Sequence, residues 1–120
     1  MPIINYEKWG MRLLRIGLAL VFLWFGIQQL MNPGDWIGYV PDIASKFFLN
    51  TTQIVLINGL FEVVASVLLI LNVYAWLAAL LLGLHMLGIS FSIGINPIGV
   101  RDIGISVGTL ALALLSPKKF

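Results

Sequence analysis

Two carboxylates and one histidine are the side chains of this sequence best placed for chemistry, because apolar residues surround them. Glu62 lies within a long apolar stretch, Asp102 near the start of another, and His85 in the middle of a third. Ionisable residues inside apolar, membrane-spanning segments are costly and are therefore functional candidates by default. Carboxylates can exchange protons, and a neutral imidazole can donate a hydrogen bond to a ring carbonyl. We therefore assign possible proton handling to Glu62 and Asp102, and a ligand contact, for instance with a quinone, to His85.

Polar side chains at matching depth are candidates for binding a ligand beside these groups. Asn58 lies four residues before Glu62 and shares its helical face. With Asn58 and His85, the candidate ligand-binding residues are Gln28, Gln29, Asn96 and Arg101. A carboxylate at the depth of Glu62 stays ionised only if Arg101 or several amide donors reach it. The cluster is either a ligand or proton site, or a set of polar contacts that holds the helices together.

The residue types exclude several redox and metal centres. The chain has no cysteine and one histidine. Disulfide exchange, cysteine-held iron–sulfur clusters and a haem ligated by two histidines of one chain are therefore excluded. We expect no metal site, and the simpler role of His85 is a hydrogen bond to Glu62 or to a backbone carbonyl. The net charge of +2 forms no basic patch, so nucleic acid is not an expected partner.

The elements that must position these residues follow from the composition. Hydrophobic residues make up 60% of the chain and charged residues 10%, against about 25% charged in soluble domains. We predict an all-α integral membrane protein, a single domain forming a four-helix transmembrane bundle. The predicted helices cover about residues 13–31, 53–71, 75–95 and 101–115. Residues 35–52, with aromatic and isolated charged residues, are either an interfacial segment or a surface loop.

The distribution of lysine and arginine predicts the orientation. Five basic residues flank the outermost helices, namely Lys8, Arg12, Arg15, Lys118 and Lys119. The two loops expected on the other side carry only Lys46 and Arg101. Basic residues concentrate on the cytoplasmic side, so both termini are expected there. The polar side chains would then lie in the outer half of the bilayer.

Other residues are predicted to serve structure. Gly104 and Gly108 form a GxxxG motif, which usually allows two helices to pack closely. Arg15 either reaches the lipid headgroups or makes a structural pairing with Glu7 or with a helix C-terminus. Three aromatic residues of the first helix are expected to serve packing or lipid contact more than a cofactor slot: Phe22, Trp24 and Phe25.

Short motifs along nearly the whole chain resemble the DoxX-like family of small four-helix membrane proteins. They are the segments from Leu14 to Gly17, Phe25 to Leu30 with Asn32 and Pro33, Phe61 to Val63, and Val100 to Gly104. In the family's pattern, Arg15, Glu62 and Asp102 match recurrent charges. Gln29 departs from a lysine common near the end of the first helix, and Asn72 from a glycine that commonly closes the second.

This resemblance implies a bacterial or archaeal cytoplasmic membrane protein and a link to quinone chemistry. One branch of the family is the membrane subunit of thiosulfate:quinone oxidoreductase. The chain is therefore expected to be a membrane subunit of a quinone-linked redox complex, or a non-catalytic anchor for a soluble or membrane oxidoreductase. It is not expected to be catalytic alone. The alternative is a small transporter or channel that acts as a homo-oligomer.

Overall fold

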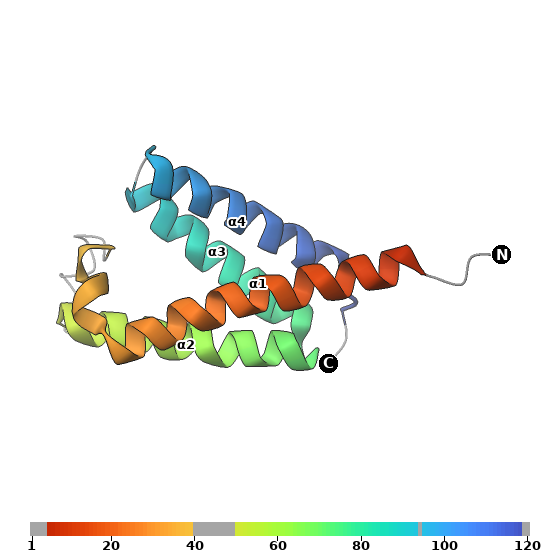
Figure 1. The fold of residues 1–120 in the computed structure, drawn as a ribbon, viewed down its shortest axis with the longest axis horizontal. Coiled ribbons are helices and arrows are strands. Elements are labelled where there is room, and N and C mark those ends of the chain that lie inside the picture. The colour runs from red at the N-terminus through yellow and green to blue at the C-terminus, as the bar shows by residue number, and fades with distance from the viewer. Residues whose placement is uncertain (1–4, 40–49, 94, 119–120) are drawn as a thin grey trace.

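Four long helices make up most of the computed structural model, which describes residues 5–39, 50–93 and 95–118 (Figure 1). In chain order, the elements are α1 (Tyr6–Met31), the 3-10 helix η1 (Pro33–Tyr39), α2 (Thr51–Leu71), α3 (Ala75–Ile93) and α4 (Pro97–Leu115). No strand occurs within these described ranges. The predicted all-α four-helix fold is confirmed.

The helices form two antiparallel pairs. α1 packs along α2 and α3 packs along α4, whereas α1 and α4 meet at few positions. In Figure 1 the two pairs diverge towards the end where α1 finishes and α4 begins. The start of α1, the α2–α3 turn and the end of α4 all lie at the opposite end. The two helix pairs therefore lie close together at one end of the bundle and further apart at the other.

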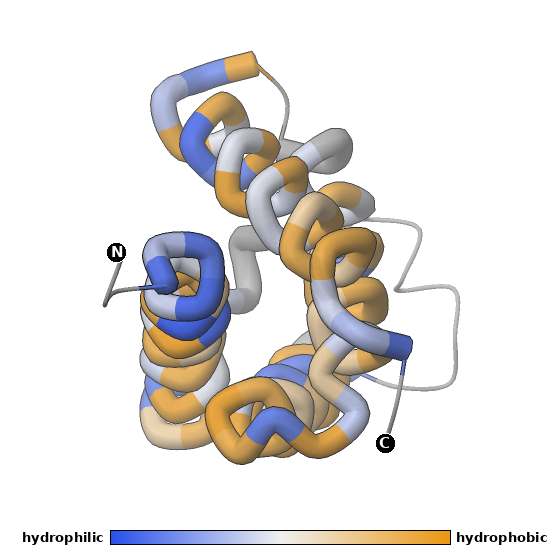
Figure 2. The backbone as a smooth tube through the Cα atoms, turned by 90° about the vertical axis from the view of Figure 1, so that its right-hand side faces the viewer, coloured by the Kyte–Doolittle hydropathy of each residue, from blue (hydrophilic) through white to orange (hydrophobic). Residues whose placement is uncertain are grey.

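The outer surface is apolar, as a bilayer requires. Leu20, Leu60, Val64, Leu84 and Val107 are more than half exposed, and apolar residues recur along all four helices (Figure 2). α1, α2 and α4 are long and apolar enough to cross a membrane, and α3 is apolar over Ala75–Ser90. The core between the helices is rich in alanine, which allows close helix packing. The chain is an integral membrane protein.

Two helices begin earlier than the predicted spans, for identifiable reasons. The side chain of Asn5 accepts a hydrogen bond from the backbone N–H of Lys8, so α1 begins at Tyr6. Its 26 residues measure roughly 39 Å, more than the hydrocarbon thickness of roughly 30 Å, so α1 extends beyond the predicted span. α4 begins at Pro97, which occupies a first-turn position behind the N-cap Asn96. The Asn96–Pro97 pair therefore starts α4 as well as ending α3, because proline is favourable in a first helical turn.

The segments that connect the helices were predicted from the sequence only in part. Part of the predicted segment 35–52 is η1, and residues 40–49 lie outside the described residues. α2 begins with a capping box between Asn50 and Gln53. Asn72 closes α2 in the left-handed conformation, with φ 58°, as expected for a residue that replaces glycine. Residues adjacent to the helix therefore set both the start and the end of α2.

Candidate functional site

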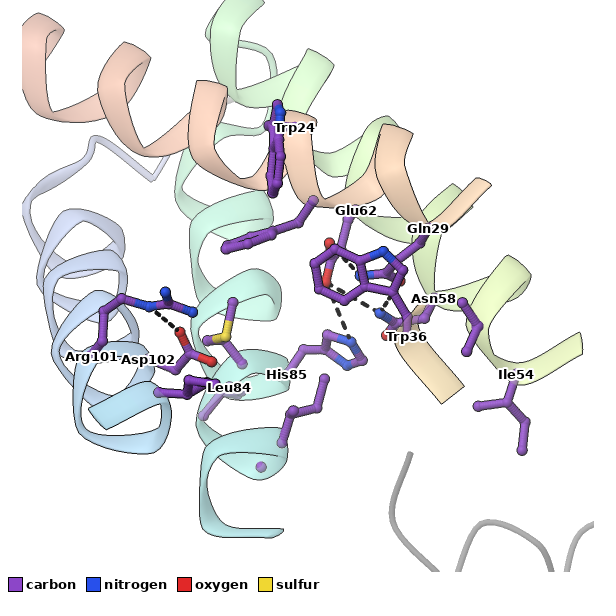
Figure 3. A pocket seen from close by; sticks show the side chains of 16 residues that line it. Trp24, Gln29, Trp36, Ile54, Asn58, Glu62, Leu84, His85, Arg101 and Asp102 are labelled. Atoms are coloured by element: carbon purple, nitrogen blue, oxygen red, sulfur yellow. Dashed lines mark hydrogen bonds and ion pairs between the residues drawn. The ribbon is translucent and has the colours of Figure 1, made fainter. Parts of the chain in front are cut away.

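A pocket of about 580 Å³ lies between the two helix pairs at their divergent end (Figure 3). α1, η1, α2, α3 and α4 all contribute side chains. Its lining is mainly aromatic and aliphatic, with five polar side chains: Gln29, Asn58, Glu62, Arg101 and Asp102, in addition to His85. An apolar pocket with a few converging polar groups is the usual form of a small-molecule site. We take it as the candidate functional site.

Glu62 of α2 lies at the base of this pocket and is held by two amides. The Nε2 atom of Gln29 donates to Glu62 Oε2 at 3.3 Å, and Asn58 Nδ2 donates to Glu62 Oε1 at 3.2 Å. Asn58 Nδ2 also donates to Gln29 Oε1 at 2.6 Å, which closes the three side chains into a ring. Glu62 is only 1% exposed, so these bonds replace the water it would otherwise bind. Of the three amide side chains expected to reach Glu62, Gln29 and Asn58 do so, whereas Gln28 is hydrogen-bonded to Asn32 instead.

His85 faces Glu62 from α3 without forming a hydrogen bond to it. Its Nε2 atom lies 4.0 Å from Glu62 Oε1 and is buried with no hydrogen-bond partner among the described residues. The ring packs edge-to-face against Phe61, with 5.1 Å between centroids. Of the two partners considered for His85, Glu62 does lie beside it, but at 4.0 Å the two atoms do not form a hydrogen bond. His85 Nε2 is thus a buried polar atom without a hydrogen bond among the described residues, next to a buried carboxylate, which is rare in a folded protein.

Aromatic rings form the wall of the pocket between α1 and η1. Phe25 packs edge-to-face on Trp24 at 5.5 Å and on Trp36 at 5.7 Å between centroids. All three residues line the pocket, whereas Phe22 is fully buried in the core. As expected from the sequence, Phe22 and Phe25 pack in or against the core and Trp24 is exposed on the outer surface; Trp24 and Phe25 also line the pocket. Trp36 was not singled out from the sequence, since its position depends on how η1 folds back.

Arg101 and Asp102 form a separate polar pair on the α4 side (Figure 3). Arg101 Nε donates to Asp102 Oδ1 at 3.2 Å. Asp102 is buried, whereas the Arg101 side chain is 57% exposed. Arg101 was considered as a counter-ion for Glu62 or for Asp102; the structure pairs it with Asp102, and no contact with Glu62 is present among the described residues. The pocket therefore has two polar sides, one at Glu62 and one at Asp102.

Two predicted binding residues lie outside the pocket lining. Gln28 accepts a hydrogen bond from Asn32 at the end of α1, at 3.4 Å. Asn96 accepts from the backbone N–H of Gly99 at 2.8 Å and so serves as the N-cap of α4. The sequence placed these polar residues at a common depth in the bundle. It did not give the side of each helix on which they lie, so only those that face the space between the helix pairs line the pocket.

Of the residues predicted to be structural, Arg15 makes a contact between described helices, whereas Gly104 and Gly108 do not. Arg15 Nη1 donates to the carbonyls of Leu69 and Ile70, both at 2.8 Å, at the C-terminal end of α2. This is one of the two structural pairings considered for it. A Cβ added to Gly104 or Gly108 would meet no atom within 4 Å, so their motif does not pack against another described helix. The close approaches occur elsewhere, at Gly26, Gly59 and Gly83.

The arrangement can bind a flat ring and present polar groups to one edge of it. The aromatic wall offers ring faces and edges, and the polar groups of the lining come from Gln29, Asn58 and Glu62 on one side and from Arg101 and Asp102 on the other. Trp24, Leu84 and Ile98 line the pocket and are also exposed on the lipid-facing surface. A molecule dissolved in the membrane therefore has an apolar approach to the site.

Comparison with known proteins gives a family assignment and no individual relative. Residues 10–94 match the sequence model of the family described as DoxX. No curated protein and no solved structure matches the chain. The matched range includes the Glu62 side of the pocket and His85 but ends before α4.

Proposed function

Because the chain belongs to the DoxX family of membrane proteins, we propose that it binds the ring of a quinone-class lipid between its helix pairs. In this proposal it is the membrane subunit or anchor of a quinone-linked redox complex. A partner oxidoreductase supplies or takes the electrons, because the sequence has no cysteine and only one histidine with which to hold a redox centre.

The observation that carries this proposal is the combination of Glu62 and His85 with an aromatic wall. Trp24, Phe25 and Trp36 give a ring-sized apolar surface, and the pocket volume of about 580 Å³ lies in the range of small-molecule sites. His85 Nε2 is a buried nitrogen without a partner among the described residues. A quinone ring has polar oxygens on an otherwise flat, apolar body, which matches both features.

Glu62 would handle the proton that accompanies a change in the redox state of the ring. It is the buried carboxylate nearest His85, and Gln29 and Asn58 fix its position. Asp102 is a second carboxylate in the same lining and pairs with Arg101. These side chains hold and orient protons, while the bound ring would supply the electron-accepting chemistry.

Occupation of the pocket can be tested by filling it. Gly88 lines the pocket, and a Cβ added there meets no atom within 4 Å, so Gly88→Leu places a side chain in the space without backbone strain. Gly17 on α1 is equally open but lies outside the lining, so Gly17→Leu is the matched control. The measurement is quenching of tryptophan fluorescence by 6-decyl-2,3-dimethoxy-5-methylbenzoquinone in micelles, with decanol as the ring-free ligand.

We expect saturable quenching by the quinone in the unaltered protein and in Gly17→Leu. Gly88→Leu should show a loss of at least about tenfold in affinity, equivalent to about 1.4 kcal/mol. Quenching that does not saturate, or that Gly88→Leu leaves unchanged, would show that the ring does not bind here.

The partner is tested by affinity purification from native membranes. The proposal expects an oxidoreductase in stoichiometric amount. Recovery of the chain as a homo-oligomer without one would remove the redox complex and favour an oligomeric transporter or channel.

A further inference from the structure

The end of the bundle opposite the pocket holds four of the five lysine and arginine residues that the structure describes. This end comprises the start of α1, the α2–α3 turn and the end of α4, and we call it the basic end (Figure 1). Its cations are Lys8, Arg12, Arg15 and Lys118, and Glu7 is the only acidic residue among its described residues. The basic end therefore has a net positive charge that attracts anions.

Two of these four cations are already bound within the protein. Arg15 Nη1 donates to two carbonyls at the end of α2, and Lys118 Nζ donates to three carbonyls at the end of α4. By contrast, Lys8 and Arg12 are exposed, and neither side chain has an ion pair or a hydrogen bond within the part of the chain that the structure describes. Their charges are therefore available to a partner outside the chain.

Trp9 holds the guanidinium of Arg12 in place. The centroid of its ring lies 5.1 Å from Arg12 Cζ, which is a cation–π contact. The N–H groups at the edge of the guanidinium stay free in this arrangement, and they match two oxygens of one phosphate. Lys8 lies one turn before Arg12 on the same face of α1, about 6 Å along the helix axis, so its ammonium can reach the same phosphate. The two cations thus form a site for one phosphate group.

These side chains lie at the depth of the lipid headgroups. About 20 helical residues cross the hydrocarbon core, and a span of that length counted back from Met31, the last residue of α1, ends near Arg12. The turns of α1 before Arg12 therefore lie beyond the hydrocarbon. Tyr6 and Trp9 in these turns are 76% and 57% exposed, as expected for aromatic residues in the interfacial layer. The phosphates of neighbouring lipids are thus at the level of Lys8 and Arg12.

We propose that Lys8 and Arg12 bind the phosphate of an anionic phospholipid at the basic end. Charge complementarity favours this occupant over a zwitterionic lipid. Phosphatidylcholine carries a quaternary ammonium that offsets its phosphate and is repelled by the two cations, whereas phosphatidylglycerol has a phosphate and no cation. The pocket lies at the other end of the bundle, so this inference does not depend on the ring binding proposed above.

The test compares two lipids that differ in headgroup charge. Native mass spectrometry of the full chain in nonionic micelles uses equimolar dioleoylphosphatidylglycerol and dioleoylphosphatidylcholine at a low ratio of lipid to protein. The measured quantity is the ratio of the two singly bound forms. A basic residue near an anionic lipid surface contributes about fivefold in affinity, so we expect the unaltered protein to prefer phosphatidylglycerol by at least about tenfold. Arg12→Gln should lower this preference by at least about threefold.

Lys118→Gln is the matched control, because it removes one positive charge from the same end of the bundle. Lys118 Nζ is bonded to carbonyls at the end of its own helix, so its loss should leave the preference within about twofold of that of the unaltered protein. Lys8→Gln removes the other exposed cation of the site and gives a second, independent test. Circular dichroism and gel filtration confirm that each variant is folded.

Three results would overturn the inference. Equal binding of the two lipids by the unaltered protein would remove the lipid site and favour an acidic protein surface as the partner of these cations. An equal loss of preference in Arg12→Gln and Lys118→Gln would show a diffuse effect of charge and no defined site. A preference that persists in folded Arg12→Gln and Lys8→Gln would place the lipid elsewhere. Ring binding is measured separately, by quenching with the quinone, so neither result decides the other.

Discussion

Gly26 of α1 and Gly59 of α2 face each other so closely that a Cβ on either would lie 2.9 Å from the carbonyl oxygen of the other. This approach brings the two backbones together one turn away from the site. Gln29 follows Gly26 on the same helical face, and Glu62 follows Gly59. The contact between the glycines therefore sets the distance over which Gln29 can donate to Glu62.

The first prediction is that Gly26→Ala destabilises the α1–α2 pair. Its Cβ would lie within 3.0 Å of Val63 and of the Gly59 carbonyl oxygen, so the helices must separate. Overpacking of this kind costs about 1–3 kcal/mol. Unfolding in mixed micelles measures the loss. Gly17→Ala, at an open position, should not destabilise. Equal stability of the two variants would contradict the close approach.

The ring formed by Gln29, Asn58 and Glu62 should show energetic coupling. Asn58→Leu removes the donor to Gln29 Oε1 and to Glu62 Oε1, which leaves buried acceptors with fewer partners. We expect a loss of about 1–3 kcal/mol in unfolding free energy. Gln29→Leu and the double variant complete a cycle, and residues in one network couple by about 0.5–3 kcal/mol. Strict additivity would show that the ring does not act as a unit.

Arg15 is predicted to fasten α1 to the end of α2. Arg15→Ala removes two hydrogen bonds to the carbonyls of Leu69 and Ile70 in the last turn of α2, where helix carbonyls lack the usual partners of the helix interior. Charged donors of this kind contribute about 1.5–3 kcal/mol, and partial exposure reduces the figure to about 1–2 kcal/mol. Arg12 is exposed and lies over the Trp9 ring, so Arg12→Ala should cost less than about 1 kcal/mol. Thermal unfolding in micelles compares them, and a larger loss for Arg12→Ala would refute the assignment.

The orientation expected from the basic residues can be tested with single cysteines, since the chain has none of its own. Gly34 in η1 and Val73 in the α2–α3 turn lie at opposite ends of the bundle and are exposed. With both termini in the cytoplasm, an impermeant maleimide should label Gly34→Cys in intact cells. It should label Val73→Cys only after the membrane is opened. The reverse pattern would invert the topology.

Local sequence signals predicted the helices and part of the site, because they act over a few residues. Asn72 could be expected in a left-handed cap, and the four-residue spacing of Asn58 and Glu62 placed them on one face. The choice of Asp102 over Glu62 as the partner of Arg101 could not be predicted, because it depends on the separation of the helix pairs and so on where glycines allow close packing. The aromatic wall was missed for a similar reason: Trp36 reaches Phe25 only through the fold of η1.

The lipid-facing approach to the pocket, through Trp24, Leu84 and Ile98, has a consequence for how affinity is to be expressed. A ligand that enters this way is supplied from the bilayer, where a lipophilic ring is far more concentrated than in water. Occupancy then follows the mole fraction of the ligand among the lipids, and its aqueous concentration is a poor guide. Under the ring binding proposed above, modest contacts within the pocket would keep the site filled in a membrane rich in the ligand, and the site would empty as that pool is diluted by other lipids.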